Sequence, residues 1–421
     1  MRLFFVFTLL LASACSDKGR VDDTQDDPQD ADGDGILAAD DCDDRDPAVG
    51  GEEVIYDGVD NDCDPSTLDD DLDGDGVVFA ADCDDGDPSV WLPSEEHAGA
   101  LSSGFNDFCA GYCERRLGGD LDLNRATPED VASLSCLVSV GGDVLLNNNN
   151  ALTSLAGLDG LAVVEGDVTI NNNALTSLAG LEGLSAVGGQ LMLERNRALE
   201  SLAGLSGLST VGGRFVLTSN GALESLSGLG GLSSVGESVT VDGNGALLSL
   251  AGLEGLIDVG EQLIIANNPA LTSLAGLEGV SSVGGGLWID NNDALTSLAG
   301  AESLSTSAGG LFVYDNDALT SLVGLERLTS VSGGLYVFNS VSLTSLSGLD
   351  GLTSVEWSLS IFENDALTSL SGLEALSTLD GDLEIRDNNN LCEDEVDALA
   401  AQLTLFSGLL YNVNNTGTCP S

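Results

Sequence analysis

A repeat of 24 residues runs through most of the chain and constrains its fold more than any other feature. One leucine of the unit recurs eleven times, with a first spacing of 23 residues and nine spacings of 24, at Leu152, Leu175, Leu199, Leu223, Leu247, Leu271, Leu295, Leu319, Leu343, Leu367 and Leu391. A typical unit, residues 271–294, reads LTSLAGLEGVSSVGGGLWIDNNDA. Periodicity this regular predicts a stack of equivalent turns that bury their apolar faces against one another. We assign residues 137–391 to this array.

Each unit contains one short segment in which apolar residues alternate with others. The alternating pairs are Val144/Leu146, Val168/Ile170, Leu191/Leu193, Phe215/Leu217, Val239/Val241, Leu263/Ile265, Leu287/Ile289, Leu311/Val313, Leu335/Val337, Leu359/Ile361 and Leu383/Ile385. A period of two predicts short strands whose apolar side chains point inward, and stacking of the turns predicts a parallel sheet. Leu121/Leu123 fits as one more strand at the N-terminal end.

Asparagine follows the strand three residues after its last inward position. It stands at Asn196, Asn220, Asn244, Asn268, Asn292, Asn316, Asn364 and Asn388, and Ser340 interrupts the series. A buried column of asparagines can bind loop amides that have no strand partner. We therefore expect an asparagine ladder along one corner of the stack.

The complete unit, L-x-I-x-x-N-x-A-L-x-S-L-x-G-L, resembles leucine-rich repeats, and most closely those of the receptor L-domain type. That resemblance implies a right-handed β-solenoid of the kind found in growth-factor receptor ectodomains and in bacterial surface lipoproteins. It is specific for fold and weak for function, since the repeated residues are structural ones.

Both ends of the array carry segments that predict caps. Thr127-Pro-Glu-Asp combines an N-cap residue, proline at the first helical position and acids in the first turn, and it lies in an N-terminal cap at 94–136. Residues 393–403 have the pattern of an amphipathic helix in a C-terminal cap at 392–421. Solenoids need such caps because their end turns lack a neighbour on one side.

Six of the nineteen aromatic residues fall at outward positions of neighbouring strands. If the leucines and isoleucines point inward, the residues between and after them form outward columns that contain Trp288, Phe312, Tyr314, Tyr336, Phe338 and Phe362. Such a patch marks an interaction site for a protein or a glycan. Two alternatives remain: the rings stack on one another to stabilise the sheet, or the C-terminal segment 406–411 covers them.

Residues 30–93 form an acidic segment with an internal duplication. DADGDGILAADDCDDRDP at 30–47 recurs as DLDGDGVVFAADCDDGDP at 71–88. Aspartates at alternate positions, a glycine at position six and a carboxylate at position twelve can converge on one calcium ion. The predicted ligands are Asp30, Asp32, Asp34, the Ile36 carbonyl and Asp41 in the first copy, and Asp71, Asp73, Asp75, the Val77 carbonyl and Asp82 in the second.

This segment resembles bacterial metal-binding repeats with the pattern DxDGDG…DCDD…DGVDNDCD, and more distantly thrombospondin type 3 repeats. The resemblance implies a small irregular module that wraps calcium. The second copy departs from the pattern because it lacks an equivalent of residues 57–64. Copper is the less favoured metal, since it prefers imidazole and sulfur and the chain has one histidine and two methionines. The alternative is an acidic spacer that binds no specific ion.

The first residues, MRLFFVFTLLLASAC, have a basic start, an apolar stretch too short to span a bilayer and small residues before Cys15. They resemble a bacterial lipoprotein signal peptide at 1–14, which implies that Cys15 carries a lipid and that the chain is anchored to the outer membrane or cell surface. The alternative is an ordinary cleaved signal. Residues 15–29 are polar and charged, and we expect them to be a disordered tether.

Eight further cysteines in an exported chain predict disulfides. Cys42–Cys63 and Cys392–Cys419 are the two pairings that we expect. The partners of Cys83, Cys109, Cys113 and Cys136 stay open.

Charge and motifs narrow the function. Sixty-nine acidic residues against twelve basic ones give a net charge of −57, which argues against nucleic acid as a partner and against membrane contact other than through the lipid. The sequence has no Ser-His-Asp set, zinc-protease motif or phosphate-binding loop. We expect a non-catalytic surface protein for recognition or adhesion. The alternatives are a structural envelope protein that self-associates through the solenoid and, more remotely, a carbohydrate-active enzyme.

Overall fold

The computed structural model describes residues 92–110 and 112–419, which belong to one compact unit. The expectations for the signal peptide, Cys15, the tether, the calcium ligands between Asp30 and Asp82 and the Cys42–Cys63 disulfide lie outside the described residues. None of the helices within the described ranges is long and apolar enough to cross a membrane.

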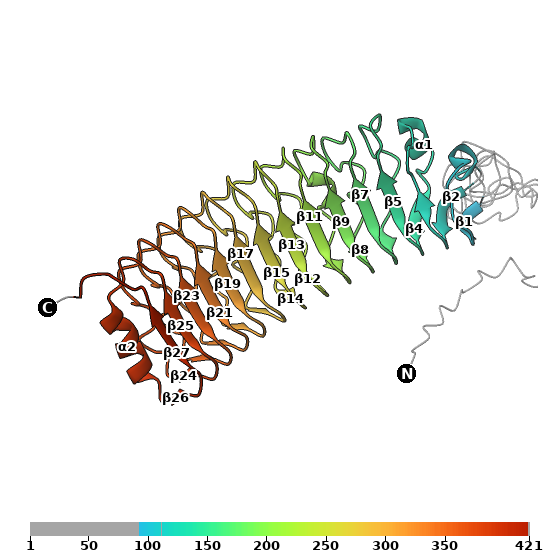
Figure 1. Ribbon diagram of the computed structural model, residues 1–421. Coiled ribbons are helices and arrows are strands. Elements are labelled where there is room, and N and C mark those ends of the chain that lie inside the picture. The colour runs from blue at the N-terminus through green and yellow to red at the C-terminus, as the bar shows by residue number, and fades with distance from the viewer. Residues whose placement is uncertain (1–91, 111, 420–421) are drawn as a thin grey trace, which may run out of the picture. The chain divides into compact units, whose positions relative to one another are not determined.

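The described chain folds into a β-solenoid with two parallel sheets (Figure 1). The longer strands form a 13-stranded sheet: β3 Leu121–Asp122, β5 Val144–Asn147, β7 Val168–Asn171, β9 Leu191–Glu194, β11 Phe215–Thr218, β13 Val239–Asp242, β15 Leu263–Ala266, β17 Leu287–Asp290, β19 Leu311–Tyr314, β21 Leu335–Phe338, β23 Leu359–Phe362, β25 Leu383–Arg386 and β27 Leu410–Val413. The repeat period sets the register, so that Leu287 pairs with Leu311 and Leu311 with Leu335. The predicted solenoid with a parallel sheet is confirmed.

A second sheet of 14 strands, which the repeat pattern did not predict, lines another side of each turn. Its strands are β1 Leu92–His97, β2 Tyr112–Leu117, β4 Leu137–Val140, β6 Val163–Val164, β8 Ala186–Val187, β10 Thr210–Val211, β12 Ser234–Val235, β14 Asp258–Val259, β16 Ser282–Val283, β18 Thr306–Ser307, β20 Ser330–Val331, β22 Ser354–Val355, β24 Thr378–Leu379 and β26 Leu405–Phe406. Most of these strands have two residues and one buried side chain, too few to show a period of two. They pair because the turns already stack at a fixed register.

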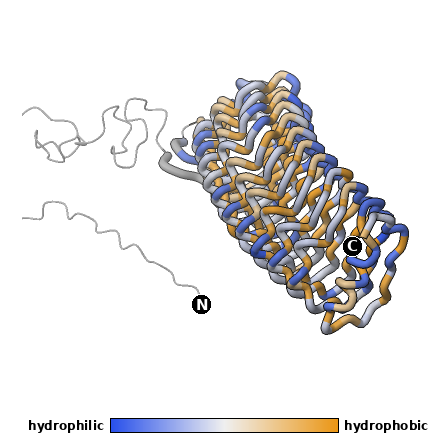
Figure 2. The backbone as a smooth tube through the Cα atoms, turned by 90° about the vertical axis from the view of Figure 1, so that its left-hand side faces the viewer, coloured by the Kyte–Doolittle hydropathy of each residue, from blue (hydrophilic) through white to orange (hydrophobic). Residues whose placement is uncertain are grey.

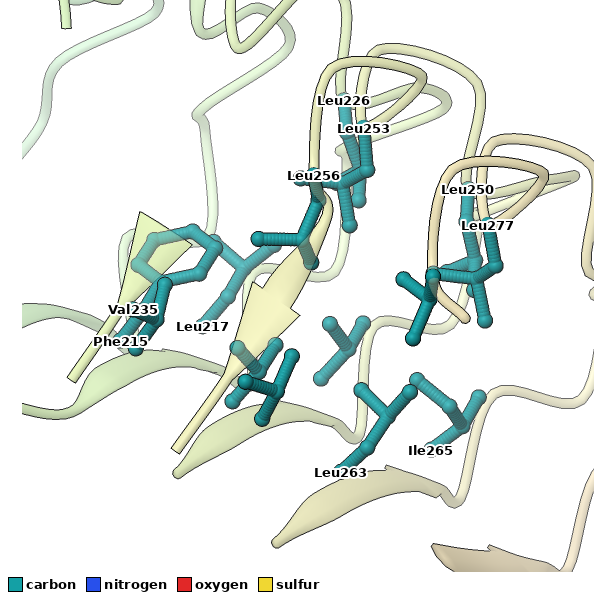
Figure 3. Packing of buried hydrophobic residues seen from close by; sticks show 14 of the residues in the cluster. Phe215, Leu217, Leu226, Val235, Leu250, Leu253, Leu256, Leu263, Ile265 and Leu277 are labelled. Atoms are coloured by element: carbon teal, nitrogen blue, oxygen red, sulfur yellow. The ribbon is translucent and has the colours of Figure 1, made fainter. Parts of the chain in front are cut away.

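The strands of the 13-stranded sheet have the predicted orientation. In β17 and β19 burial alternates between buried and half-buried residues, and the inward Ile289 and Val313 are fully buried. Together with the leucines of the connecting segments, such residues make one continuous apolar core along the solenoid (Figure 3). Close approach of successive turns requires glycine at some corners: a Cβ atom at Gly276 would lie 2.1 Å from the Leu250 carbonyl oxygen, and its φ of 115° disfavours other residues.

The predicted asparagine ladder is present and is longer than expected, since Asn149, Asn173 and Asn415 extend it at its ends. At Asn292 the side-chain oxygen accepts a hydrogen bond from Asn268 N at 3.1 Å, and Nδ2 donates to the carbonyls of Ile265 and Asp290 at 2.9 Å each. Just before it in the chain Asn291 has a φ of 52°, a left-handed conformation that asparagine and aspartate tolerate. That conformation turns the chain out of the strand and into the ladder.

Helices and disulfides close the two ends. Helix α1, Pro128–Ala132, begins at the predicted N-cap Thr127, whose hydroxyl accepts from Asp130 N at 3.2 Å. Helix α2, Glu393–Gln402, ends one residue earlier than expected. The Cys392–Cys419 disulfide is confirmed, and Cys109–Cys136 resolves one pairing left open. Two 3-10 turns, Phe105–Asp107 and Ala203–Leu205, complete the described elements.

Candidate ligand-binding face

The outer surface of the 13-stranded sheet carries the six aromatic residues singled out above, on strands β17, β19, β21 and β23. The parallel register places Trp288 beside Phe312 and Phe312 beside Tyr336. In the next outward column, Tyr314 lies beside Phe338 and Phe338 beside Phe362. All six side chains are half-buried. The structure therefore brings the predicted residues together, as two columns of three.

Within each column the rings stack face to face. Ring centroids are 4.5 Å apart between Trp288 and Phe312 and 4.9 Å apart between Phe312 and Tyr336, with interplanar angles of 9° and 5°. Centroids of the second column are 4.6 Å apart at both contacts, with angles of 4° and 5°. These distances match the spacing of neighbouring strands, about 4.7–4.9 Å. We call the six residues the aromatic ladder.

Stacking decides which part of each ring a ligand can reach. Because the ring planes lie across the direction in which the strands stack, each inner ring has both faces covered by its neighbours. The edges of the rings remain for contact with solvent, while Arg386 lies over the outer face of Phe362 at one end of the second column. The alternative expectation that neighbouring rings stack on the sheet is thus confirmed, and stacking is compatible with binding at the edges.

Glycines make room for the first column. A Cβ atom at Gly310 would lie 2.5 Å from Phe312 Cε2, and one at Gly286 would lie 2.4 Å from Trp288 Cζ3. Gly334 has the same relation to Tyr336. A ring at this position leans back over the residue two places earlier, which must lack a side chain. The sequence signal is Gly-Leu followed by an aromatic residue, and the sequence analysis missed it.

Arg386 extends the second column at its C-terminal end. Its guanidinium carbon lies 4.3 Å from the centroid of the Phe362 ring, within the range of a cation–π contact. The Arg386 guanidinium donates hydrogen bonds to Glu384 and Asp387 at 2.7 Å each. These two hydrogen bonds raise the pKa of Arg386. The pKa of Asp387 is lowered by a hydrogen bond from Asn414 and by the one from Arg386.

Asp290 occupies the opposite end of that column, beside Tyr314. Burial raises the pKa of Asp290 to about 6, with further contributions from the negative charges of Asp242 and Asp315, while a hydrogen bond from Tyr314 opposes the shift. Burial also raises the pKa of Tyr314, and Asp290 adds to that shift. Asp290 is thus a carboxylate without a cationic partner in the described part of the chain, at the open end of a ring stack.

The C-terminal segment does not cover the ladder. Strand β26 pairs with β24 and β27 with β25, so that residues 405–413 extend the ends of the two sheets. The alternative expectation that segment 406–411 covers the rings is wrong, because its backbone finds strand partners at the end of the stack.

Other chemistry in the described residues is sparse. His97, the one histidine of the chain, lies in β1 with its ring 6.0 Å from that of Phe108, remote from the ladder in sequence and in the sheet order. The one group of metal-ligand side chains found within 92–110 and 112–419 is Cys392, Asp394 and Cys419, and its two sulfurs form a disulfide. A shallow hollow over the second sheet, lined by Val163, Ala186, Thr210 and Ser234, was not expected from the sequence.

The chain matches no protein-family model. A search of the curated proteins finds no similar sequence. The two parallel sheets and the 24-residue period define the described residues as a parallel β-solenoid repeat protein.

Proposed function

We propose that this chain is a non-catalytic recognition protein that binds a protein ligand along the aromatic ladder. One observation carries the proposal: six aromatic side chains form two half-buried stacks on the outer surface of a sheet that no described segment crosses. Aromatic patches whose rings are partly accessible on a protein surface are typical of interaction sites. The stacked rings are held rigid, so a ligand would not have to order them on binding.

The geometry favours a protein segment over a glycan. Sugars commonly bind to open ring faces, and here neighbouring rings cover the inner faces. Ring edges suit apolar side chains and backbone carbonyls, and the outer faces of the end rings suit cations. Arg386 above Phe362 is an example of such a cation within the chain. With Asp290 at the other end and a net charge of −57, the preferred segment combines apolar and basic side chains.

The regions outside the described residues complete the proposal. We propose that Cys15 carries a lipid that anchors the chain to the outer membrane or cell surface. The acidic module at 30–93 would bind calcium through the aspartates of its two copies and act as a spacer between anchor and solenoid. The sequence features that support this are the small residues before Cys15 and the duplicated DxDGDG pattern. The receptor L-domain type of leucine-rich repeat remains the family resemblance that we favour.

Calcium binding has a direct test. Calorimetric titration of the mature chain with calcium, and separately with copper, should show calcium binding below millimolar concentration and a gain of ordered structure in the acidic module. An absence of calcium binding below that concentration would reduce the module to an acidic spacer.

The ladder is tested by selecting displayed random peptides on the wild-type chain. The key variant is Tyr336→Ser, since serine already occupies the same column at Ser360. The matched control is Val216→Ser, which lies in that column outside the ladder. We expect selected peptides to be rich in arginine and aromatic residues, to bind Tyr336→Ser at least about tenfold more weakly and to bind the control normally.

Two outcomes would contradict the proposal. Equal binding to Tyr336→Ser and to the wild type would place the site elsewhere. Binding on a glycan array that depends on Tyr336, with no peptide selected, would replace the protein ligand with a sugar.

A further inference from the structure

The last strand of the 13-stranded sheet has one edge without a partner in the described part of the chain. Strand β27 pairs with β25: Leu383 N donates to Leu409 O, and Asp387 N to Val413 O, at 2.9 Å each. In a parallel ladder alternate residues bond to the same neighbour, so the N–H and C=O groups of Leu410 and Asn412 point away from β25. The chain then leaves this edge, since Gly417 N donates to Leu391 O and Cys419 bonds to Cys392.

The same strand and Leu409, the residue before it, present exposed apolar side chains. Relative exposure is 61% at Leu409, 41% at Leu410, 42% at Tyr411 and 48% at Val413. Figure 2 is turned so that the side on the left of Figure 1, where the C-terminal end lies, faces the viewer. A free strand edge with apolar side chains is a template for pairing with another strand.

Charge distinguishes this end from the rest of the molecule. Residues 404–421 contain no charged side chain, in a chain whose net charge is −57. Two copies would repel each other over most of their surfaces. The edge of the terminal strand itself brings no carboxylate to a contact. The acidic groups beside it lie on α2, where Asn412 Nδ2 donates to Glu393 O and to Asp397 Oδ1 at 3.1 Å each.

We propose that β27 is the interface of a homodimer, in which it pairs antiparallel with β27 of a second copy about a two-fold axis at Tyr411. In this register Leu410 lies opposite Asn412 of the second copy. The pair exchanges two backbone hydrogen bonds, and its symmetry mate exchanges two more. All four unpaired N–H groups and all four C=O groups of the two edges are then satisfied.

The same register matches the outward side chains. Tyr411 lies opposite Tyr411 of the second copy, and Leu409 lies opposite Val413, so that the whole row is apolar. A contact of this isologous kind closes at two copies. Head-to-tail stacking onto β3, at the other end of the same sheet, would instead grow without limit, and the outer side of β3 is already bridged by Leu101. The row of matched apolar pairs therefore favours a dimer of identical ends.

Sedimentation velocity of the mature chain tests the proposal. We expect a monomer–dimer equilibrium in the range of about 1 to 100 µM, as befits a small interface, that shifts toward dimer as salt screens the net charge. Leu409→Glu with Val413→Glu places two pairs of carboxylates directly opposite each other and should weaken dimerisation by roughly a hundredfold or more.

Two further variants separate register from mere added charge. Leu409→Glu with Val413→Lys sets opposite charges face to face in the proposed register and should restore the dimer. Leu248→Glu with Ile257→Glu alters two residues that are 52% and 59% exposed in the middle of the solenoid, and it should dimerise as the wild type does.

The proposal is overturned if the wild type stays monomeric or forms species larger than dimers. Dissociation by added salt, or dimerisation of the Glu/Glu variant, would also overturn it, as would a monomeric Glu/Lys variant with the circular dichroism of the folded chain.

Discussion

Replacing Asn292 with serine should destabilise the solenoid, because asparagine at this buried position satisfies three backbone groups at once. Its oxygen accepts from Asn268 N at 3.1 Å, and its Nδ2 donates to the carbonyls of Ile265 and Asp290 at 2.9 Å each. Ser340 shows what serine does at the equivalent place: its hydroxyl accepts from Asn316 N at 3.4 Å, and within the described residues it donates to no carbonyl of the strands.

The expected loss of stability follows from the two hydrogen bonds that Asn292 Nδ2 donates, which are lost, and from the one that its oxygen accepts, which becomes longer. A buried hydrogen bond contributes about 0.5–1.5 kcal/mol net, and the Asp290 carbonyl keeps its bond from Asn267 N at 3.0 Å in the variant. Loss of two bonds should therefore lower the free energy of unfolding of Asn292→Ser by about 1–3 kcal/mol. The reciprocal change, Ser340→Asn, should raise it by about 1–3 kcal/mol, since Asn316 and Asn364 on either side already set the ladder geometry.

Urea unfolding followed by circular dichroism measures both variants. The control is Asn389→Ser, which removes one exposed hydrogen bond, from Asn389 Nδ2 to Asp365 at 2.6 Å, and should change stability by less than about 1 kcal/mol. The reasoning is refuted if Asn292→Ser is as stable as this control, or if Ser340→Asn destabilises the chain. Either result would mean that packing, rather than the hydrogen bonds of the ladder, holds this corner together.

Three other predictions concern the ladder and the C-terminal end. The pKa of Asp290 is raised to about 6, so the folded state binds this proton more tightly than the unfolded state does. The resulting stabilisation is present below pH 4 and is lost as pH rises through 6. Asp290→Asn should therefore raise the melting temperature more at pH 7 than at pH 4, and an equal gain at both would contradict the assignment. Phe312→Ala removes both stacking contacts of its column and should lower the free energy of unfolding by about 1–3 kcal/mol beyond the loss of burial. Urea midpoints equal to those of Val216→Ala would show that stacking adds no stability. Replacing Cys392 and Cys419 with serine opens a loop of sequence separation 27 and should lower the free energy of unfolding by roughly 3–4 kcal/mol. Hydrogen exchange in the last turn should become faster, and unchanged exchange would show that the cap is stable without the disulfide.

Much of the fold could be predicted from the sequence because the repeat encodes it locally. Alternation in segments such as residues 287–290 identifies the inward side chains, and a period of 24 residues sets the register of one turn on the next. The asparagine position follows from the same frame, and the Cys392–Cys419 disulfide was predicted because these cysteines bracket the C-terminal segment. The outward placement of the aromatic residues followed as well, since it is the complement of the inward pattern.

The second sheet could not be predicted in this way. A strand such as Ser282–Val283 has two residues and one buried side chain, and its pairing depends on turns that are 24 residues away in sequence.

The sequence by itself thus determined which side chains are buried, how the turns align and which six aromatic residues share one surface. Only the tertiary structure decided that their rings stand in two stacks, that Asp290 is held partly buried among other carboxylates and that β27 ends the sheet with an apolar free edge. The physical reason is the range of the interactions. Burial is specified by local pattern, whereas ring orientation, pKa and the state of a strand edge depend on neighbours contributed by other turns.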